Sequence, residues 1–253
     1  MKKSILIGIN KYPVNYTLEG CQNDVTLWED VLRIKFGFIT KKKYDLLKQE
    51  VLDQLQLLVS SLEKGDIGVF FFSGHGVRRH DDSDKYNEGI VATDKVIWDY
   101  EIDKFKKRVK KDRKLILIFD TCHSEGVFEP HKFLDFERIG LNYMVKSIPV
   151  EDMEFPSVES NEDEGLVMRE VNGDSVITLA ACGKYKQAYE KQFGEMYNGV
   201  FSHYATQILL RGNENINFGN FLDLVNTEIK DKENVEQVSV ISDYDLKMEH
   251  KMF

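Results

Sequence analysis

Four short apolar runs, rich in β-branched or aromatic residues, constrain the fold of this chain most strongly. They lie at residues 4–9, 68–72, 115–119 and 175–181. A strand with one solvated face alternates apolar and polar residues, whereas a strand covered on both faces is apolar throughout. The runs therefore predict strands that lie inside a sheet with both faces buried.

Helical repeats occupy the intervals between these runs. Apolar residues recur every three or four positions within residues 25–32, 47–62 and 102–109, and two later segments, 201–211 and 218–230, also look helical. Residues 235–242 look like a last strand. Alternating strands and helices predict an α/β fold with a mostly parallel central sheet and helices on both faces.

The chain reads as one domain over residues 1–253, because it shows no internal repeat and no linker rich in Pro, Gly or Ser. Two segments interrupt the pattern. Residues 81–88 predict a polar, acidic loop, and the stretch from about 129 to 174 has no sustained period. A loop this long is either a disordered insertion or a functional one, here a regulatory or cleavable segment.

Composition narrows the environment and the partners. The chain has 43 acidic and 34 basic residues, a net charge of −9 that argues against nucleic-acid binding. We interpret the basic stretch at 104–114 as a solvated helix face rather than a nucleic-acid patch. No apolar stretch is long enough to span a membrane or to form a signal peptide, and three cysteines imply no disulfide framework. These features predict a cytoplasmic protein without membrane association.

Two strand ends carry residues that could do chemistry. His75 lies between two glycines just after one apolar run, and Cys122 lies three residues after the next. Sites in open parallel sheets form at the carboxyl ends of strands, where an imidazole could activate a thiol nucleophile. The amides of Gly76 and Cys122 are candidate oxyanion donors. The ordinary alternatives are a buried apolar cysteine and a structurally satisfied histidine.

Several sequence blocks resemble those of the metacaspases, the caspase-like cysteine peptidases. FFFSGHG at 70–76 and IFDTCHSEG at 118–126 resemble the family's histidine and cysteine blocks. Further blocks follow the family's order along the chain: LEGCQND at 18–24, YNEGIVATD at 86–94, TLAACG at 178–183, QAYE at 187–190 and GVFSH at 199–203. The resemblance implies a three-layer caspase-like α/β sandwich. One departure lies within the cysteine block, where Glu125 takes the place of the glycine that usually follows Cys-His-Ser.

The resemblance also assigns site residues. It implies that His75 is the general base and acid and that Cys122 is the nucleophile. It places four residues in an acidic pocket for the substrate's P1 side chain, the S1 pocket: Cys21, Asp24, Ser73 and Asp120. Two carboxylates in one pocket repel each other and are relieved by a cation, so the expected P1 residue is Arg or Lys. The alternative for Asp24 is a helix N-cap ahead of residues 25–32.

The chemistry itself requires no cofactor, but many metacaspases need calcium. The matching positions are Asn87 in place of one acid, Asp99, Tyr100 in place of a second acid, and Glu129. Hard cations prefer several charged oxygen ligands, so the loss of two carboxylates should weaken this site.

An Arg- or Lys-specific peptidase could also cut its own long loop. The candidate bonds follow Arg138, Lys146 and Arg169, and Arg169 stands out as the only base between residues 151 and 174. The prediction is therefore a cysteine endopeptidase that acts on proteins after Arg or Lys, through an acyl-enzyme, as a monomer. The alternative is a catalytically silent caspase-fold scaffold or regulatory interaction module.

Overall fold

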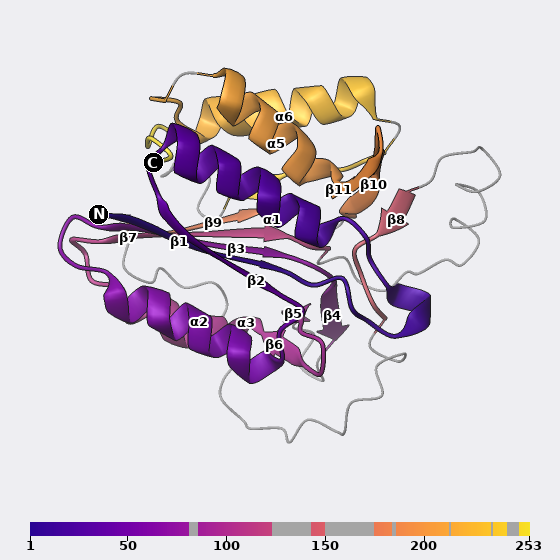
Figure 1. The fold of residues 1–253 in the computed structure, drawn as a ribbon, viewed down its shortest axis with the longest axis horizontal. Coiled ribbons are helices and arrows are strands. Elements are labelled where there is room, and N and C mark those ends of the chain that lie inside the picture. Colours follow the sequence, from indigo (N-terminus) through magenta and orange to yellow (C-terminus); the bar gives the residue numbers. More distant parts are fainter. Residues whose placement is uncertain are drawn as a thin grey trace.

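The computed structural model of the chain describes residues 1–80, 86–122, 143–149, 175–183, 186–212, 214–233, 235–241 and 248–253. In this part of the chain, the centre is a six-stranded sheet of order β12-β9-β7-β3-β1-β2 (Figure 1). Its strands are β1 (Lys2–Gly8), β2 (Ile39–Tyr44), β3 (Ile67–Ser73), β7 (Lys114–Asp120), β9 (Val176–Ala180) and β12 (Val240–Ile241). All neighbours are parallel except β12, which pairs antiparallel with β9.

Helices cover both faces of this sheet, as Figure 1 shows. One face carries α1 (Cys21–Asp30) with its π-helical continuation η2 (Val31–Lys35), α5 (Val200–Arg211) and α6 (Phe218–Lys232). The other carries α2 (Lys48–Ser61) and α3 (Asp99–Lys106). Alternate residues of β3 serve the two cores, because Phe71 packs with the first set of helices and Phe70 and Phe72 with the second. This is why the strand sequences are apolar throughout.

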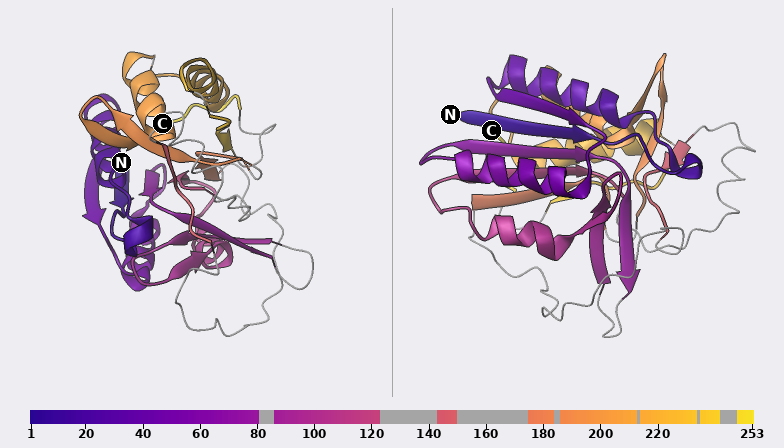
Figure 2. Two further views of the ribbon diagram at one scale, coloured as in Figure 1. Left: turned by 90° about the vertical axis from the view of Figure 1, so that its right-hand side faces the viewer. Right: turned by 60° about the horizontal axis from the view of Figure 1, so that its bottom comes forward.

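Two small antiparallel sheets lie at the end of the central sheet where its parallel strands finish (Figures 1 and 2). One has the order β4 (Gly76–His80), β5 (Tyr86–Val91), β6 (Val96–Trp98). The other has the order β11 (Met196–Gly199), β10 (Tyr189–Phe193), β8 (Tyr143–Val145). A short helix, η1 (Val14–Tyr16), precedes α1.

The structure confirms the predicted fold class and the four apolar strands. It also corrects several local predictions. The acidic loop at 81–88 is too long, because β5 already begins at Tyr86, and the last strand is only Val240–Ile241. The basic stretch at 104–114 is not one helix face, because α3 ends at Lys106 and turns lead into β7.

Candidate active site

The carboxyl ends of β3 and β7 bring predicted pocket and catalytic residues to one edge of the central sheet. The two strands pair in register as far as Ser73 and Asp120, which lie opposite each other. His75 follows two residues after Ser73, and Cys122 two residues after Asp120. One pair of adjacent strands thus supplies two pocket candidates and both candidate catalytic residues.

The start of α1 positions Asp24. The N-cap of the helix is Gly20, so the alternative reading of Asp24 as the N-cap is wrong. The side-chain oxygen of Asn10 accepts hydrogen bonds from the backbone amides of Cys21 and Gln22, at 3.0 and 3.3 Å, and so satisfies two amides of the first turn. Asp24 lies one turn into the helix, fully buried, with its carboxylate free to serve the pocket.

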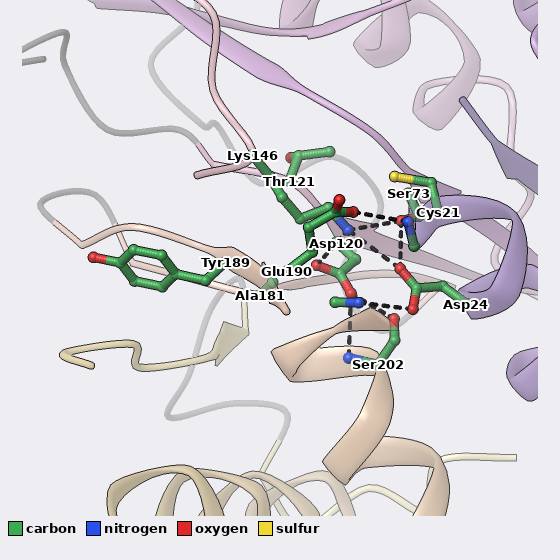
Figure 3. Close-up of polar contacts among 12 residues, drawn as sticks. Cys21, Asp24, Ser73, Asp120, Thr121, Lys146, Ala181, Tyr189, Glu190 and Ser202 are labelled. Atoms are coloured by element: carbon green, nitrogen blue, oxygen red, sulfur yellow. Dashed lines mark hydrogen bonds and ion pairs between the residues drawn. The ribbon is translucent and has the colours of Figure 1, made fainter. Parts of the chain in front are cut away.

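Asp24 is held from three sides (Figure 3). Its Oδ1 accepts hydrogen bonds from Asn198 Nδ2 at 3.1 Å and from the backbone amide of Gly199 at 2.9 Å. Its Oδ2 accepts from Ser73 Oγ at 2.7 Å. Burial raises the pKa of Asp24, while the ammonium of Lys146 opposes the rise. A buried carboxylate with this many donors is built to stay ionised beside a cation.

Asp120 faces Asp24 across the pocket and is anchored to the start of α5. Its Oδ2 accepts hydrogen bonds from the Ser202 backbone amide at 3.2 Å and from Ser202 Oγ at 2.5 Å. A Cβ atom on Gly199 would lie 2.2 Å from the same oxygen, so only glycine fits there. The pocket wall therefore depends on the tight turn from β11 into α5.

A lysine of the chain itself fills this acidic pocket. Lys146 is fully buried, and its Nζ lies 2.7 Å from Ser73 Oγ, 3.1 Å from Asp120 Oδ1 and 3.3 Å from Asp24 Oδ2 (Figure 3). Burial alone would lower the pKa of the lysine, but the surrounding acids raise it well above its ordinary value. Two carboxylates and one ammonium thus form a closed ionic cluster with no exposed charge.

The backbone of Lys146 is bound as closely as its side chain. Its carbonyl oxygen accepts hydrogen bonds from the amides of Gly76 and Cys122, at 2.9 and 3.0 Å. Its amide donates to the carbonyl of Ala188 at 3.0 Å, and the amide of Ile148 donates to the Gly76 carbonyl at 3.1 Å. The two amides expected to hold an oxyanion therefore hold the same carbonyl oxygen. A segment bound in this way is arranged as a substrate would be, with Lys146 at P1.

His75 is nearly buried and lies between two tyrosines. Its Nε2 is 2.6 Å from the Tyr16 carbonyl, and because a carbonyl only accepts, Nε2 carries the proton and Nδ1 does not. The ring of Tyr12 meets the imidazole edge-to-face at 4.5 Å, and its hydroxyl accepts from the His75 amide at 3.0 Å. Nδ1 is buried and has no hydrogen-bond partner among the described residues. Burial lowers the pKa of His75 to about 3, so the ring is neutral with one free basic nitrogen.

The three cysteines are buried, and no disulfide links them to one another in the described part of the chain. The Cys122 thiol donates a weak hydrogen bond to the carbonyl oxygen of Lys186, with 3.9 Å between Sγ and the oxygen. Burial raises the pKa of Cys21 well above its ordinary value, so this thiol lines the pocket as a neutral group. Cys182 Sγ contacts the Thr121 carbonyl at 3.6 Å, behind the candidate nucleophile.

Sequence reasoning missed a third acid of the pocket. Glu190 is fully buried and accepts hydrogen bonds from the amides of Glu19 and Gly20, at 2.8 and 3.0 Å, where they precede the start of α1. Burial raises its pKa to about 7, while Lys146 opposes the rise. It lies in the QAYE block, which was noted without a role. Two further supporting residues were also missed: Asn198 and Ser202.

The predicted metal positions are only partly described. Asn87 lies in β5 and Asp99 begins α3, whereas Glu129 lies outside the described residues. Asp99 lines a mostly apolar cavity of about 280 Å³ together with Glu88 and Lys106, and burial raises the pKa of Asp99 to about 6. Within the described ranges, no three His, Cys, Asp or Glu side chains gather as metal ligands would.

Of the three candidate self-cleavage positions, Lys146 is the one that can be located. Arg138 and Arg169 lie outside the described residues. Among the helices of the described segments, none is both long and apolar enough to cross a membrane.

Comparisons with known proteins identify the family of the chain. The family model described as the caspase domain matches residues 1–249. Metacaspase-1 of Plasmodium falciparum is 34% identical over 145 residues, which are 49% of this chain and 24% of that protein. Metacaspase-8 of Arabidopsis thaliana is 32% identical over 160 residues, 56% of this chain and 41% of that protein. The matches thus span less than half of either relative.

A solved structure supports the fold. The crystal structure of protein GSU0716 from Geobacter sulfurreducens superposes with a TM-score of 0.73 at 16% identity. The match covers 95% of this chain and 92% of that one, so the architecture is shared over nearly the whole length.

Proposed function

The chain belongs to the caspase-domain family, and from this premise we propose that it is a cysteine endopeptidase that cleaves the peptide bond after Lys or Arg. The observation that carries the proposal is the way Lys146 is bound in the acidic pocket. Its ammonium lies between Asp24 and Asp120, and its carbonyl oxygen accepts from two backbone amides. Side-chain selection and carbonyl activation thus meet at one residue.

The charge of the pocket explains the proposed preference. Asp24, Asp120 and Glu190 bring three carboxyl groups into one buried region. A P1 ammonium offsets part of their negative charge, and a guanidinium can bridge two carboxylates with its fork of donors. A P1 aspartate would add another buried negative charge without a cation, which is strongly unfavourable. We therefore assign P1 specificity to basic residues.

The chemistry proposed follows from the two candidate catalytic residues. The Cys122 thiol gives its proton to His75 Nδ1 as Sγ attacks the scissile carbonyl carbon. The negative charge that develops on the carbonyl oxygen is stabilised by the amides of Gly76 and Cys122. The C–N bond then breaks, and the imidazolium returns the proton to the leaving amine. Water, deprotonated by His75, hydrolyses the thioester and frees the thiol.

The same geometry makes the chain its own first substrate. In the described segment 143–149, the bond in the cleavage position joins Lys146 to Ser147. While this segment is bound, no other P1 side chain can enter the pocket, so cleavage here would open the site. This proposal favours Lys146 over Arg169 as the site of self-processing, and Arg138 and Arg169 stay predictions.

We also propose that the chain acts on protein substrates and that it is a monomer in the cytoplasm, without membrane or nucleic-acid partners. Its chemistry requires no cofactor. Calcium stays a possible activator at Asn87, Asp99 and Glu129. The competing function is a silent scaffold, but a scaffold has no need for an unprotonated buried imidazole nitrogen two residues after the pocket residue Ser73.

Hydrolysis of fluorogenic peptides tests the proposal. Peptides with P1 Lys, Arg and Asp are incubated with the wild-type chain and with Cys122→Ala, with and without calcium. We expect hydrolysis of the Lys and Arg peptides by wild type alone. Absence of such activity under every condition supports the scaffold instead, and activity on Asp peptides alone overturns the pocket argument.

A further inference from the structure

The segment around Lys146 also occupies the cleft beyond the S1 pocket. β8 pairs antiparallel with β10, so that Val145 lies opposite Tyr189, Met144 opposite Glu190, and Tyr143 opposite Lys191. Counted from Lys146 as P1, these residues take the positions P2, P3 and P4. The edge of β10 is therefore the surface on which a bound peptide would lie as an added strand.

The P4 residue, Tyr143, is bound as specifically as the P1 lysine. It is 5% exposed, and its hydroxyl donates a hydrogen bond to Glu233 Oε2. Its ring meets Tyr189 edge-to-face at 5.9 Å, and Lys191 Nζ lies 5.3 Å from the ring centroid. The ring is thus held by its faces and edges, and the hydroxyl by a carboxylate.

The carboxylate of Glu233 is preorganised by the body of the domain. It follows directly after α6, and its side chain is 1% exposed. Lys191 Nζ lies 2.5 Å from Oε2, and the hydroxyl of Tyr204 donates to Oε1. Burial alone would raise the pKa of Glu233, but the hydrogen bonds from Lys191, Tyr143 and Tyr204 lower it below its ordinary value. Lys191 and Tyr204 lie outside the 143–149 segment, so they still hold this carboxylate when that segment leaves.

We propose that Glu233, held by Lys191 and Tyr204, forms an S4 subsite that selects a tyrosine three residues before the basic P1 residue of a protein substrate. The inference rests on the proposed function, because the peptide register is counted from Lys146 as P1. Phenylalanine fills the ring site but leaves the carboxylate without its third donor. A P4 glutamate places a second negative charge against Glu233 and is rejected.

A matched set of peptides tests the subsite. Fluorogenic peptides of sequence Tyr-Met-Val-Lys, Phe-Met-Val-Lys and Glu-Met-Val-Lys are compared on full-length enzyme, incubated until its activity is constant. Because the contact is a buried hydrogen bond to a charged acceptor, we expect kcat/KM for the Tyr peptide to exceed that for the Phe peptide by about tenfold or more. The Glu peptide should be the poorest of the three.

Two variants locate the effect. Glu233→Gln weakens the acceptor, and the Tyr-to-Phe ratio should fall to about threefold or less. Tyr44→Phe, the matched control, removes an exposed tyrosine hydroxyl on the edge strand β2 and should leave the ratio near its wild-type value. If Glu233→Gln does not fold, Glu233→Asp withdraws the carboxylate from the P4 hydroxyl and should give the same loss.

The outcomes separate the two proposals. Equal hydrolysis of the Tyr and Phe peptides by wild type, or a ratio unchanged in the Glu233 variants, overturns the S4 subsite and leaves the Lys specificity intact. If the enzyme hydrolyses none of the three peptides and no other Lys or Arg peptide, the proposed function is overturned and the subsite with it.

Discussion

The two halves of the cleft differ in how their polar groups are satisfied. In the acidic pocket, all four carboxylate oxygens of Asp24 and Asp120 contact a donor or the Lys146 ammonium. On the catalytic side, His75 Nδ1 is buried, and no described residue forms a hydrogen bond with it. The pocket is therefore built for binding a cation, whereas the imidazole is held neutral with its Nδ1 unprotonated. Substitutions in the two halves should have different consequences.

The largest effect is expected on the catalytic side. Cys122→Ala removes the nucleophile but only a small buried side chain, so hydrolysis of Lys peptides should fall by at least about 10⁴-fold while the fold persists. Peptide kinetics and circular dichroism measure the two properties. Cys182→Ala is the matched control, since it removes a buried thiol after the neighbouring strand, and it should keep most of the activity.

Substitutions in the pocket should act first on stability. Lys146→Met leaves Asp24 and Asp120 buried without their cation, so the free energy of unfolding should fall by about 3 to 5 kcal/mol. Urea denaturation of the catalytically inactive Cys122→Ala background measures this without self-cleavage. Lys48→Met, which breaks the partly exposed ion pair with Glu101, should cost about 1 kcal/mol or less. Equal losses for the two lysines would contradict a closed ionic cluster.

A smaller effect, dependent on pH, is expected at Glu190. Its folded pKa of about 7 lies above the ordinary 4.5, so the folded state holds this proton more tightly than the unfolded state. The resulting stability is full below about pH 4.5 and is lost as pH rises to about 7. Relative to Glu190→Gln, the wild type should therefore lose on the order of 3 kcal/mol between pH 4.5 and 8.

Thermal unfolding from pH 4.5 to 8 measures this difference in the Cys122→Ala background. Glu195→Gln, in the exposed turn between β10 and β11, is the control and should follow the wild-type profile. A Glu190→Gln variant whose stability runs parallel to wild type over this range would show that Glu190 is ionised throughout.

The elements that could be predicted from the sequence are those whose side chains share one environment. β3 and β7 are buried on both faces, and each is therefore a continuous apolar run. β2 was missed because it is an edge strand with mostly exposed side chains, and lysines occupy three of its six positions. β12 is too short to have a pattern of its own.

The candidate site divides in the same way. Asp24, Ser73 and Asp120 lie in contiguous blocks that resemble a family, so their pocket could be expected. Glu190 was missed because its role depends on the start of α1, which is 170 residues away in the sequence. The binding of Lys146 in the acidic pocket was missed as well. An isolated charge such as Arg169 is conspicuous in a sequence, whereas nothing in the sequence marks a lysine that binds to distant carboxylates. Long-range pairing decides such roles.

The central claim is that Lys146 occupies the position of a P1 residue. Mass spectrometry of the purified chain after incubation, alongside Cys122→Ala, tests it most directly. We expect a new carboxyl terminus at Lys146 and a new amino terminus at Ser147 in the wild type, and an intact variant. A wild-type chain that hydrolyses Lys peptides while its Lys146–Ser147 bond stays whole would contradict it.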